Sequence, residues 1–172
     1  MLSELKERGV EYVIRPATRD DYDELSLAFT EVELLHRTAL PHVFRAPDDP
    51  ELNREHFAAV LVDEDAAWLV AEHAGAIIGF VKLRIMHALD RPVFVPRSYA
   101  EVDSLAVRAQ YRRAGIGRAL MERAERWAAE RGLNEVQLNV WEFNQGAIAF
   151  YEELGYVTER RQMRRVISNG NS

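Results

Sequence analysis

The chain has 172 residues, of which 48% are hydrophobic and 29% charged, and its formal net charge is −6. This length and composition predict one globular domain over residues 1–172, and the excess of acids excludes the basic surface typical of nucleic-acid-binding proteins. The absence of cysteine excludes disulfides, thiol nucleophiles and thiolate metal sites.

The first part of the chain predicts a strand followed by two helices. Residues 12–15 alternate between apolar and polar side chains, as a half-buried strand does. A helix-start signature at residues 18–21 precedes apolar positions at helical spacing, and this helix breaks at Pro41. After a proline-marked loop, a second helix is expected through residues 57–60.

The middle of the chain predicts three strands. Residues 67–72 and 76–83 are β-rich runs joined by a short glycine-containing loop, which is typical of a hairpin. Residues 86–98 contain two prolines and are expected to form a loop or an edge excursion. Residues 100–107 then have the pattern of a further strand.

The last part alternates helix and strand. Apolar spacing predicts a helix over residues 116–128, and residues 135–141 follow as a strand. Residues 144–155 predict a short helix between an asparagine cap and a glycine stop. One or two strands are expected over residues 156–167, with a frayed tail at 168–172.

Neither a metal site nor a membrane segment is indicated. No apolar run is long enough to cross a bilayer, and the first eight residues alternate in charge, so we expect a cytoplasmic protein with no membrane partner. The histidines lack the i, i+4 pairing and the clustered carboxylates of a metal site, and we expect them to have surface or packing roles. They are His36, His42, His56, His73 and His87.

A glycine-containing turn at residues 112–117 (RRAGIG) joins a predicted strand to a predicted helix. The start of a helix offers unpaired N–H groups and the positive end of the helix dipole, which favour an anion. Gly115 and Gly117 allow close approach of the backbone. The spacing matches neither the Rossmann fingerprint nor the Walker A loop, so by itself the segment is equally compatible with a tight turn.

Three segments together resemble the GNAT superfamily of acetyl-CoA-dependent N-acetyltransferases. Residues 112–117 match its Gln/Arg-x-x-Gly-x-Gly/Ala motif, and residues 105–107 resemble the end of the strand before it. Residues 144–156 resemble the Asn, Ala, Tyr and Gly-Phe/Tyr positions of its later segment. Residues 14–22 are similar to the usual opening of these domains.

The resemblance implies a GNAT-like α/β fold: a mixed, mostly antiparallel central sheet with flanking helices, in which strands 100–107 and 135–141 run parallel and splay apart. Acetyl-CoA would be the acyl donor, with no metal, and its pyrophosphate would lie on the N–H groups of residues 113–118. The implied contacts to the coenzyme are Leu105, Ala106, Val107, Arg112, Arg113, Ala114, Gly115, Ile116, Gly117, Arg118, Asn144, Ala147 and Tyr151.

The resemblance also implies catalytic roles. Tyr151 would protonate the leaving thiolate, although a core aromatic is the structural alternative. Asn144 would make a polar contact to the coenzyme, and it can serve as a helix cap as well.

The base is expected among two acids on one strand. Glu101 and Asp103 lie two residues apart and so project from one face, and Glu101 falls where several family members carry a catalytic glutamate. A β-bulge would change which of them reaches the cleft. Both would alternatively be solvated carboxylates, or would bind a cationic substrate without proton transfer.

The expected activity is transfer of an acetyl group to a primary amine by direct attack in a ternary complex, since no cysteine supports an acyl-enzyme. The amine is not identified by the sequence. The alternative is a non-catalytic module that binds acetyl-CoA or CoA as a sensor or within an assembly. A homodimer is compatible with either interpretation.

Overall fold

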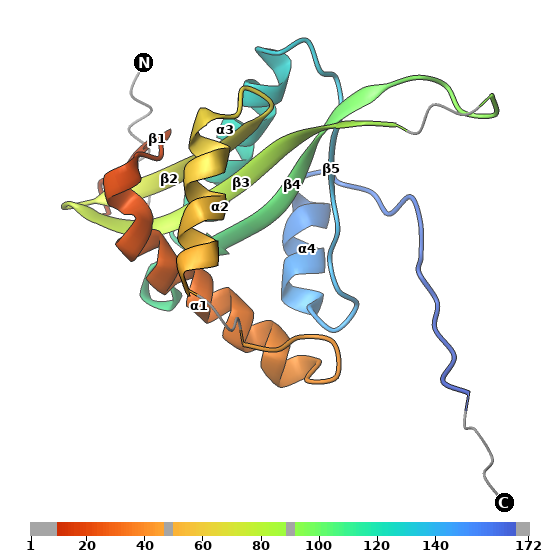
Figure 1. The fold of residues 1–172 in the computed structure, drawn as a ribbon, viewed down its shortest axis with the longest axis horizontal. Helices are drawn as coiled ribbons and strands as arrows, with labels where there is room; N and C mark the ends of the chain where they lie inside the picture. The colour runs from red at the N-terminus through yellow and green to blue at the C-terminus, as the bar shows by residue number, and fades with distance from the viewer. Residues whose placement is uncertain (1–9, 47–49, 89–91, 168–172) are drawn as a thin grey trace, which may run out of the picture. The chain divides into compact units, whose positions relative to one another are not determined.

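The computed structural model describes residues 10–46, 50–88 and 92–167. The chain divides into two compact units, residues 1–139 and residues 140–172. The first unit contains the sheet and three of the helices, and the second contains one short helix (Figure 1). That the whole chain acts as one domain stays a prediction.

The first unit is built on a five-stranded sheet whose strands lie in chain order. Neighbouring strands are antiparallel from the first to the fourth, and the fourth and fifth are parallel, as the resemblance implies. The strands are β1 (Val13–Pro16), β2 (Ala66–His73), β3 (Ala76–His87), β4 (Ser98–Val107) and β5 (Val136–Leu138).

Helices cover both faces of this sheet (Figure 1). On one face, α1 (Tyr22–Ala39) and α2 (Pro50–Val62) bury Leu25 and Phe57 against Trp68 and Phe80 of the sheet. On the other face, α3 (Ile116–Ala129) buries a full apolar stripe, as its helical spacing predicts. Its buried residues are Ile116, Ala119, Leu120, Met121, Ala124, Trp127 and Ala128.

The β2–β3 hairpin is confirmed, with a two-residue turn at Ala74 and Gly75. Both residues have positive φ, 50° and 82°, which matches the twist of the flanking strands. The arms of the next hairpin are longer than predicted: β3 runs to His87 and β4 begins at Ser98, so both ends of the expected loop 86–98 are strand.

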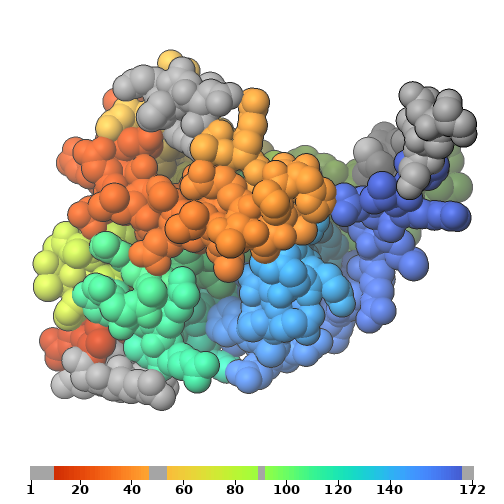
Figure 2. Space-filling view, turned by 90° about the horizontal axis from the view of Figure 1, so that it is seen from below, coloured from red at the N-terminus to blue at the C-terminus, as the bar shows by residue number. Residues whose placement is uncertain are grey.

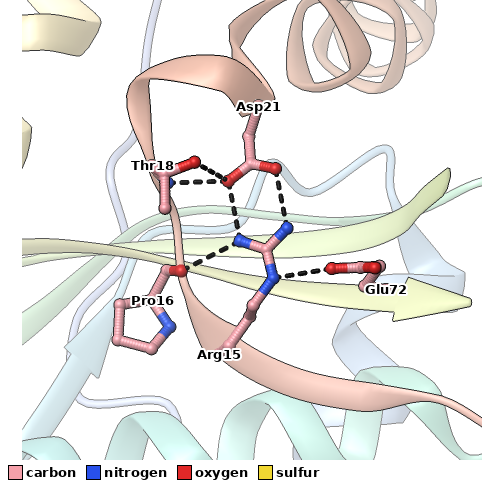
Figure 3. Close-up of polar contacts among 5 residues, drawn as sticks. All are labelled: Arg15, Pro16, Thr18, Asp21 and Glu72. Carbon is pink, nitrogen blue, oxygen red and sulfur yellow. Dashed lines mark hydrogen bonds and ion pairs between the residues drawn. The ribbon is translucent and has the colours of Figure 1, made fainter. Parts of the chain in front are cut away.

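A polar network ties β1 to the start of α1 and to β2 (Figure 3). The guanidinium of Arg15 donates two hydrogen bonds of 2.7 Å to the carboxylate of Asp21 and a third, of 2.6 Å, to Glu72. The Asp21 carboxylate also accepts the N–H and the hydroxyl of Thr18. Asp21 is buried and its partners are charged or hydrogen-bonded, so the network fixes the entry into the first helix.

The predicted splay between β4 and β5 is visible in the strand pairing. β5 pairs with β4 only at Ala100, Glu101 and Val102, so β4 continues from residue 103 to Val107 without a partner on that side within the described chain. The predicted strand 135–141 is wrong in extent, because β5 has three residues and ends at Leu138.

The second unit contains α4 (Gln145–Glu153), as predicted. Asn144 caps it, since its Oδ1 accepts the N–H of Ala147 at 3.1 Å, and Gly155 follows at φ 92°. The predicted strands over residues 156–167 are wrong: the described residues 156–167 have no regular structure and expose their apolar side chains. Two arginine pairs interrupt the apolar alternation there. The predicted tail at 168–172 lies outside the described residues.

Candidate active site

The glycine turn between β4 and α3 presents a row of backbone donors. After a 3₁₀ turn at residues 109–111, Arg113 and Gly115 take positive φ values of 64° and 79°, and α3 begins at Ile116. Within the described chain, none of the recorded hydrogen bonds uses the N–H groups of residues 113–118. Unpaired N–H groups at a helix N-terminus, with the helix dipole behind them, form a phosphate site.

Glu31 of α1 makes polar contacts with the chain just before this turn. Glu31 accepts the N–H of Ala109 at 3.3 Å and lies 3.8 Å from the guanidinium of Arg112. Arg112 also donates to the carbonyl oxygen of Val107 at 3.0 Å, so it bridges the end of β4 and α1. Figure 2 shows the green segment around residue 110 lying beside the orange-red α1. The strand end and the turn are therefore anchored before any ligand binds.

One of the two predicted acids, Asp103, lies in a β-bulge, and the other, Glu101, lies in the regular part of β4. Lys82 of β3 pairs with Ser104 and the next residue, Leu83, pairs with Val102, so Asp103 is the extra residue of β4. The sequence analysis allowed for a bulge at this strand, and the register places it at Asp103. Its carboxylate lies 2.6 Å from the ammonium of Lys82.

Glu101 is held more tightly than Asp103. Its Oε2 accepts two hydrogen bonds from Arg84, at 2.7 and 2.9 Å, and its Oε1 accepts one from Asn139 at 3.1 Å. The Glu101 side chain is 13% exposed, whereas that of Asp103 is 33% exposed. Among the described residues, the one charged partner of Asp103 Oδ1 is Arg84, at 3.7 Å, which is beyond hydrogen-bonding distance. Of the two acids, Asp103 is therefore the one with a carboxylate oxygen, Oδ1, that accepts no hydrogen bond from a described residue.

His56 of α2 joins this cluster, which the sequence analysis missed. Its Nε2 lies 2.8 Å from Lys82 Nζ, and partial burial, followed by the ammonium of Lys82, lowers the pKa of His56 below its ordinary value. The only signal in the sequence was a histidine on an amphipathic helix, and nothing there links it to a lysine 26 residues away. His56 and Lys82 thus extend the predicted acid pair to a mixed cluster.

The remaining predicted site residues lie in the second unit. Tyr151 packs its ring against Phe150 at 5.2 Å and Tyr156 at 5.9 Å between centroids, and burial raises its pKa to about 12. Asn144 is the α4 cap, and Ala147 supplies the N–H that it accepts. Their contacts to a coenzyme stay predictions, as do those of Arg118 and of Leu105, Ala106 and Val107 on β4.

Neither a metal-binding cluster nor a membrane-spanning helix is present among the described residues. No group of three or more histidines, cysteines and acids in residues 10–46, 50–88 and 92–167 is arranged to hold a metal ion. In the same residues, no helix combines the length and apolar character needed to span a membrane.

The comparisons with known proteins agree with the geometry. Residues 29–156 match the model of the acetyltransferase (GNAT) family. The chain belongs to this family. It is 31% identical over 168 residues to an N-alpha-acetyltransferase of Sulfurisphaera tokodaii, covering 95% of the chain and 90% of the relative. It is also 30% identical to an uncharacterized N-acetyltransferase, MJ1207, of Methanocaldococcus jannaschii, covering 84% of the chain and 60% of that relative.

Solved structures of this GNAT protein's relatives share its fold. A mutant of the BH1408 protein of Bacillus halodurans superposes with a TM-score of 0.85 at 27% identity, over 91% of this chain and 99% of that one. An aminoglycoside 6'-N-acetyltransferase of Acinetobacter baumannii superposes with a TM-score of 0.69 at 17% identity, over 92% and 99% of the two chains. The second likeness shows the fold alone.

Proposed function

We propose that this GNAT protein transfers the acetyl group of acetyl-CoA to the α-amino group of a peptide or protein. The observation that carries the proposal is the row of unpaired N–H groups over residues 113–118, at the N-terminus of α3, in a chain of an acetyltransferase family. This row suits a pyrophosphate, which the coenzyme carries and an amine acceptor lacks.

The coenzyme would bind along the first unit in two parts. Its pyrophosphate would accept hydrogen bonds from residues 113–118, with Arg112 and Arg113 adding positive charge at the rim. Its pantetheine amides would pair with the backbone of β4 beyond Val102, where β5 no longer pairs, in the manner of an added strand. The buried Ala106 side chain faces the core, so this pairing would use main-chain groups.

Asp103 is our candidate for the base. Both oxygens of Glu101 already accept hydrogen bonds, from Arg84 and Asn139, so an acceptor amine would have to displace one of these donors to reach it. Asp103 keeps one oxygen open and is the more exposed of the two. Glu101 would then be a positioning residue, which links Arg84 to Asn139 at the point where β4 and β5 part.

Tyr151 is our candidate for the acid. Because burial raises the pKa of Tyr151 to about 12, its phenol keeps its proton at every pH near neutral. It is therefore in the protonated form that a general acid needs when the thioester bond breaks. Asn144 and Ala147, on the same short helix, would contact the coenzyme arm.

The proposed reaction is a direct transfer. The acceptor ammonium loses a proton to Asp103, and its nitrogen attacks the thioester carbonyl. The tetrahedral intermediate then expels the CoA thiolate, which takes the phenolic proton, and the second proton that the nitrogen loses restores the phenol. The products are an amide and CoA, and no acyl-enzyme is needed, in keeping with a chain that has no cysteine.

Two observations support an α-amino acceptor. The relative that is 31% identical over nearly the whole chain is named an N-alpha-acetyltransferase. The site cluster also balances its charge, because Lys82 and Arg84 already pair with Asp103 and Glu101. A polycationic acceptor would find no surplus of acids there, whereas a single α-amine, with an ordinary pKa of about 8, needs only one base.

Calorimetry followed by a kinetic assay tests the proposal. Acetyl-CoA should bind the protein, and thiol release should then require an amine acceptor. Varying both substrates should give intersecting double-reciprocal lines, as a ternary complex requires. Tight binding of acetyl-CoA without thiol release on any amine would indicate a non-catalytic coenzyme-binding module instead of an enzyme. No binding of acetyl-CoA would refute both interpretations.

A further inference from the structure

Three polar groups form a line from the β4 bulge to the surface of α2. Asp103 Oδ2 lies 2.6 Å from Lys82 Nζ, and Lys82 Nζ lies 2.8 Å from His56 Nε2. An ammonium group can only donate, so His56 Nε2 accepts and the ring carries its proton on Nδ1. An ion pair and a hydrogen bond therefore connect a carboxylate, an ammonium and a neutral imidazole.

The two ends of this line differ in their access to water. The Lys82 side chain is 13% exposed and lies 5.6 Å from the centre of the Trp68 ring, so the middle of the line is shielded. His56 is exposed on α2, so the outer end reaches solvent. A proton placed on Asp103 thus has a bonded route to the surface through Lys82.

We propose that Asp103, Lys82 and His56 form an outlet that delivers the proton of the acceptor amine to solvent. The proposal rests on the proposed function, because the proton comes from the amine that attacks acetyl-CoA. His56 acts through Lys82 and does not touch the acceptor, so it is a positioning residue for proton release.

The protons balance over one turnover. Asp103 takes a proton from the acceptor ammonium on Oδ1, and rotation of the carboxyl group turns this oxygen towards Lys82. Lys82 passes one of its own protons to His56 Nε2 and takes the proton held by Asp103. The imidazolium then loses its Nδ1 proton to water, and exchange with water returns the exposed ring to its starting tautomer. Carboxylate, ammonium and neutral imidazole are all restored.

The charges around His56 favour loss of a proton from the imidazolium over its retention. A protonated ring would face the ammonium of Lys82, and this repulsion, added to partial burial, lowers the pKa of the imidazole. The imidazolium is therefore short-lived at neutral pH. The charged groups that act on the ring are Lys82 and Arg84 from β3 and Asp103 from β4. On α2 itself, the charged sequence neighbours of His56 are Arg54, which is paired with Asp23 of α1, and Glu55.

His56→Gln separates proton transfer from simple support of Lys82. Glutamine can still accept a hydrogen bond from the ammonium but cannot carry a proton on. With the amine that the wild type acetylates, we expect kcat to fall about 10-fold at pH 6.5, where the amine is protonated, and to be unchanged at pH 9.5, where it is mostly neutral. The KM for acetyl-CoA should not change at either pH.

Two further variants complete the test. In His56→Ala, added imidazole should restore kcat at pH 6.5, and Glu55→Gln, a neighbouring change on α2, should match the wild type. If His56→Gln lowers kcat equally at both pH values, or at neither, the proposed route for proton release would be wrong. Absence of turnover in the wild type would instead refute the proposed function.

Discussion

Replacing Asp21 by Asn should destabilise the first unit in a pH-dependent way. The Arg15 guanidinium, by hydrogen bonding first, lowers the pKa of Asp21 from 3.8 to about 2 in the folded protein (Figure 3). Since this carboxylate is only 10% exposed, the lowered pKa corresponds to about 2 kcal/mol of folding free energy at neutral pH. The amide of Asn keeps the shape of the carboxylate but removes its charge.

The sign of the pH dependence follows from the lowered pKa. The contribution is complete above the unfolded pKa of Asp, and it is lost as the pH falls from about 5 towards 2. We therefore expect Asp21→Asn to lose about 2 kcal/mol at pH 7 and progressively less below pH 4. Urea unfolding followed by circular dichroism at several pH values measures this difference.

Asp20→Asn is the matched control, because Asp20 is the exposed neighbour in the same turn. It should change stability by less than about 0.5 kcal/mol. An Asp21→Asn effect that is the same at pH 7 and at pH 3 would refute the reasoning, since a loss of packing alone does not titrate.

Three further predictions concern single residues. Gly79→Ala should lower the free energy of unfolding by about 1–3 kcal/mol, because a Cβ there would lie 2.8 Å from the carbonyl oxygen of Ala106. A Cβ at Gly146 would have no heavy atom within 4 Å, so Gly146→Ala should not lower the free energy of unfolding in the same urea titration. Gly115→Ala should weaken acetyl-CoA binding about 10-fold by calorimetry, because the turn needs φ 79° there; unchanged affinity would exclude this turn as the phosphate site. Tyr151→Phe should lower kcat by about 10–100-fold with nearly unchanged acetyl-CoA affinity, and unaltered turnover would remove Tyr151 from the mechanism.

Local chemistry made most of the fold predictable. The Ala74–Gly75 turn, the apolar stripe of α3 and the Asn144 cap each depend on residues close together in the sequence, and each is confirmed. The sequence failed where a strand depends on a distant partner. β5 ends early because it parts from β4, and residues 156–167 pair with nothing in the described sheet.

The parts of the candidate site that depend on local spacing were also predictable, and the parts that depend on distant contacts were not. The glycine turn and the two acids of β4 could be found from spacing, and in the structure both acids lie near Arg84, with Asp103 in a bulge. Our choice of Asp103 as the candidate base could not be made from spacing, because it depends on contacts with Arg84 and Lys82 from β3 and with Asn139 beyond β5. His56 enters through a contact between α2 and β3 that no local pattern encodes.

The most direct test of the central claim is mass spectrometry of the acceptor after incubation with the protein and acetyl-CoA. A peptide with a free α-amino group should gain one acetyl group at its N-terminus, in step with release of CoA thiol, and the same peptide with a blocked N-terminus should gain none. An unmodified free peptide, under conditions where acetyl-CoA is bound, would contradict the claim that this protein is an N-terminal acetyltransferase.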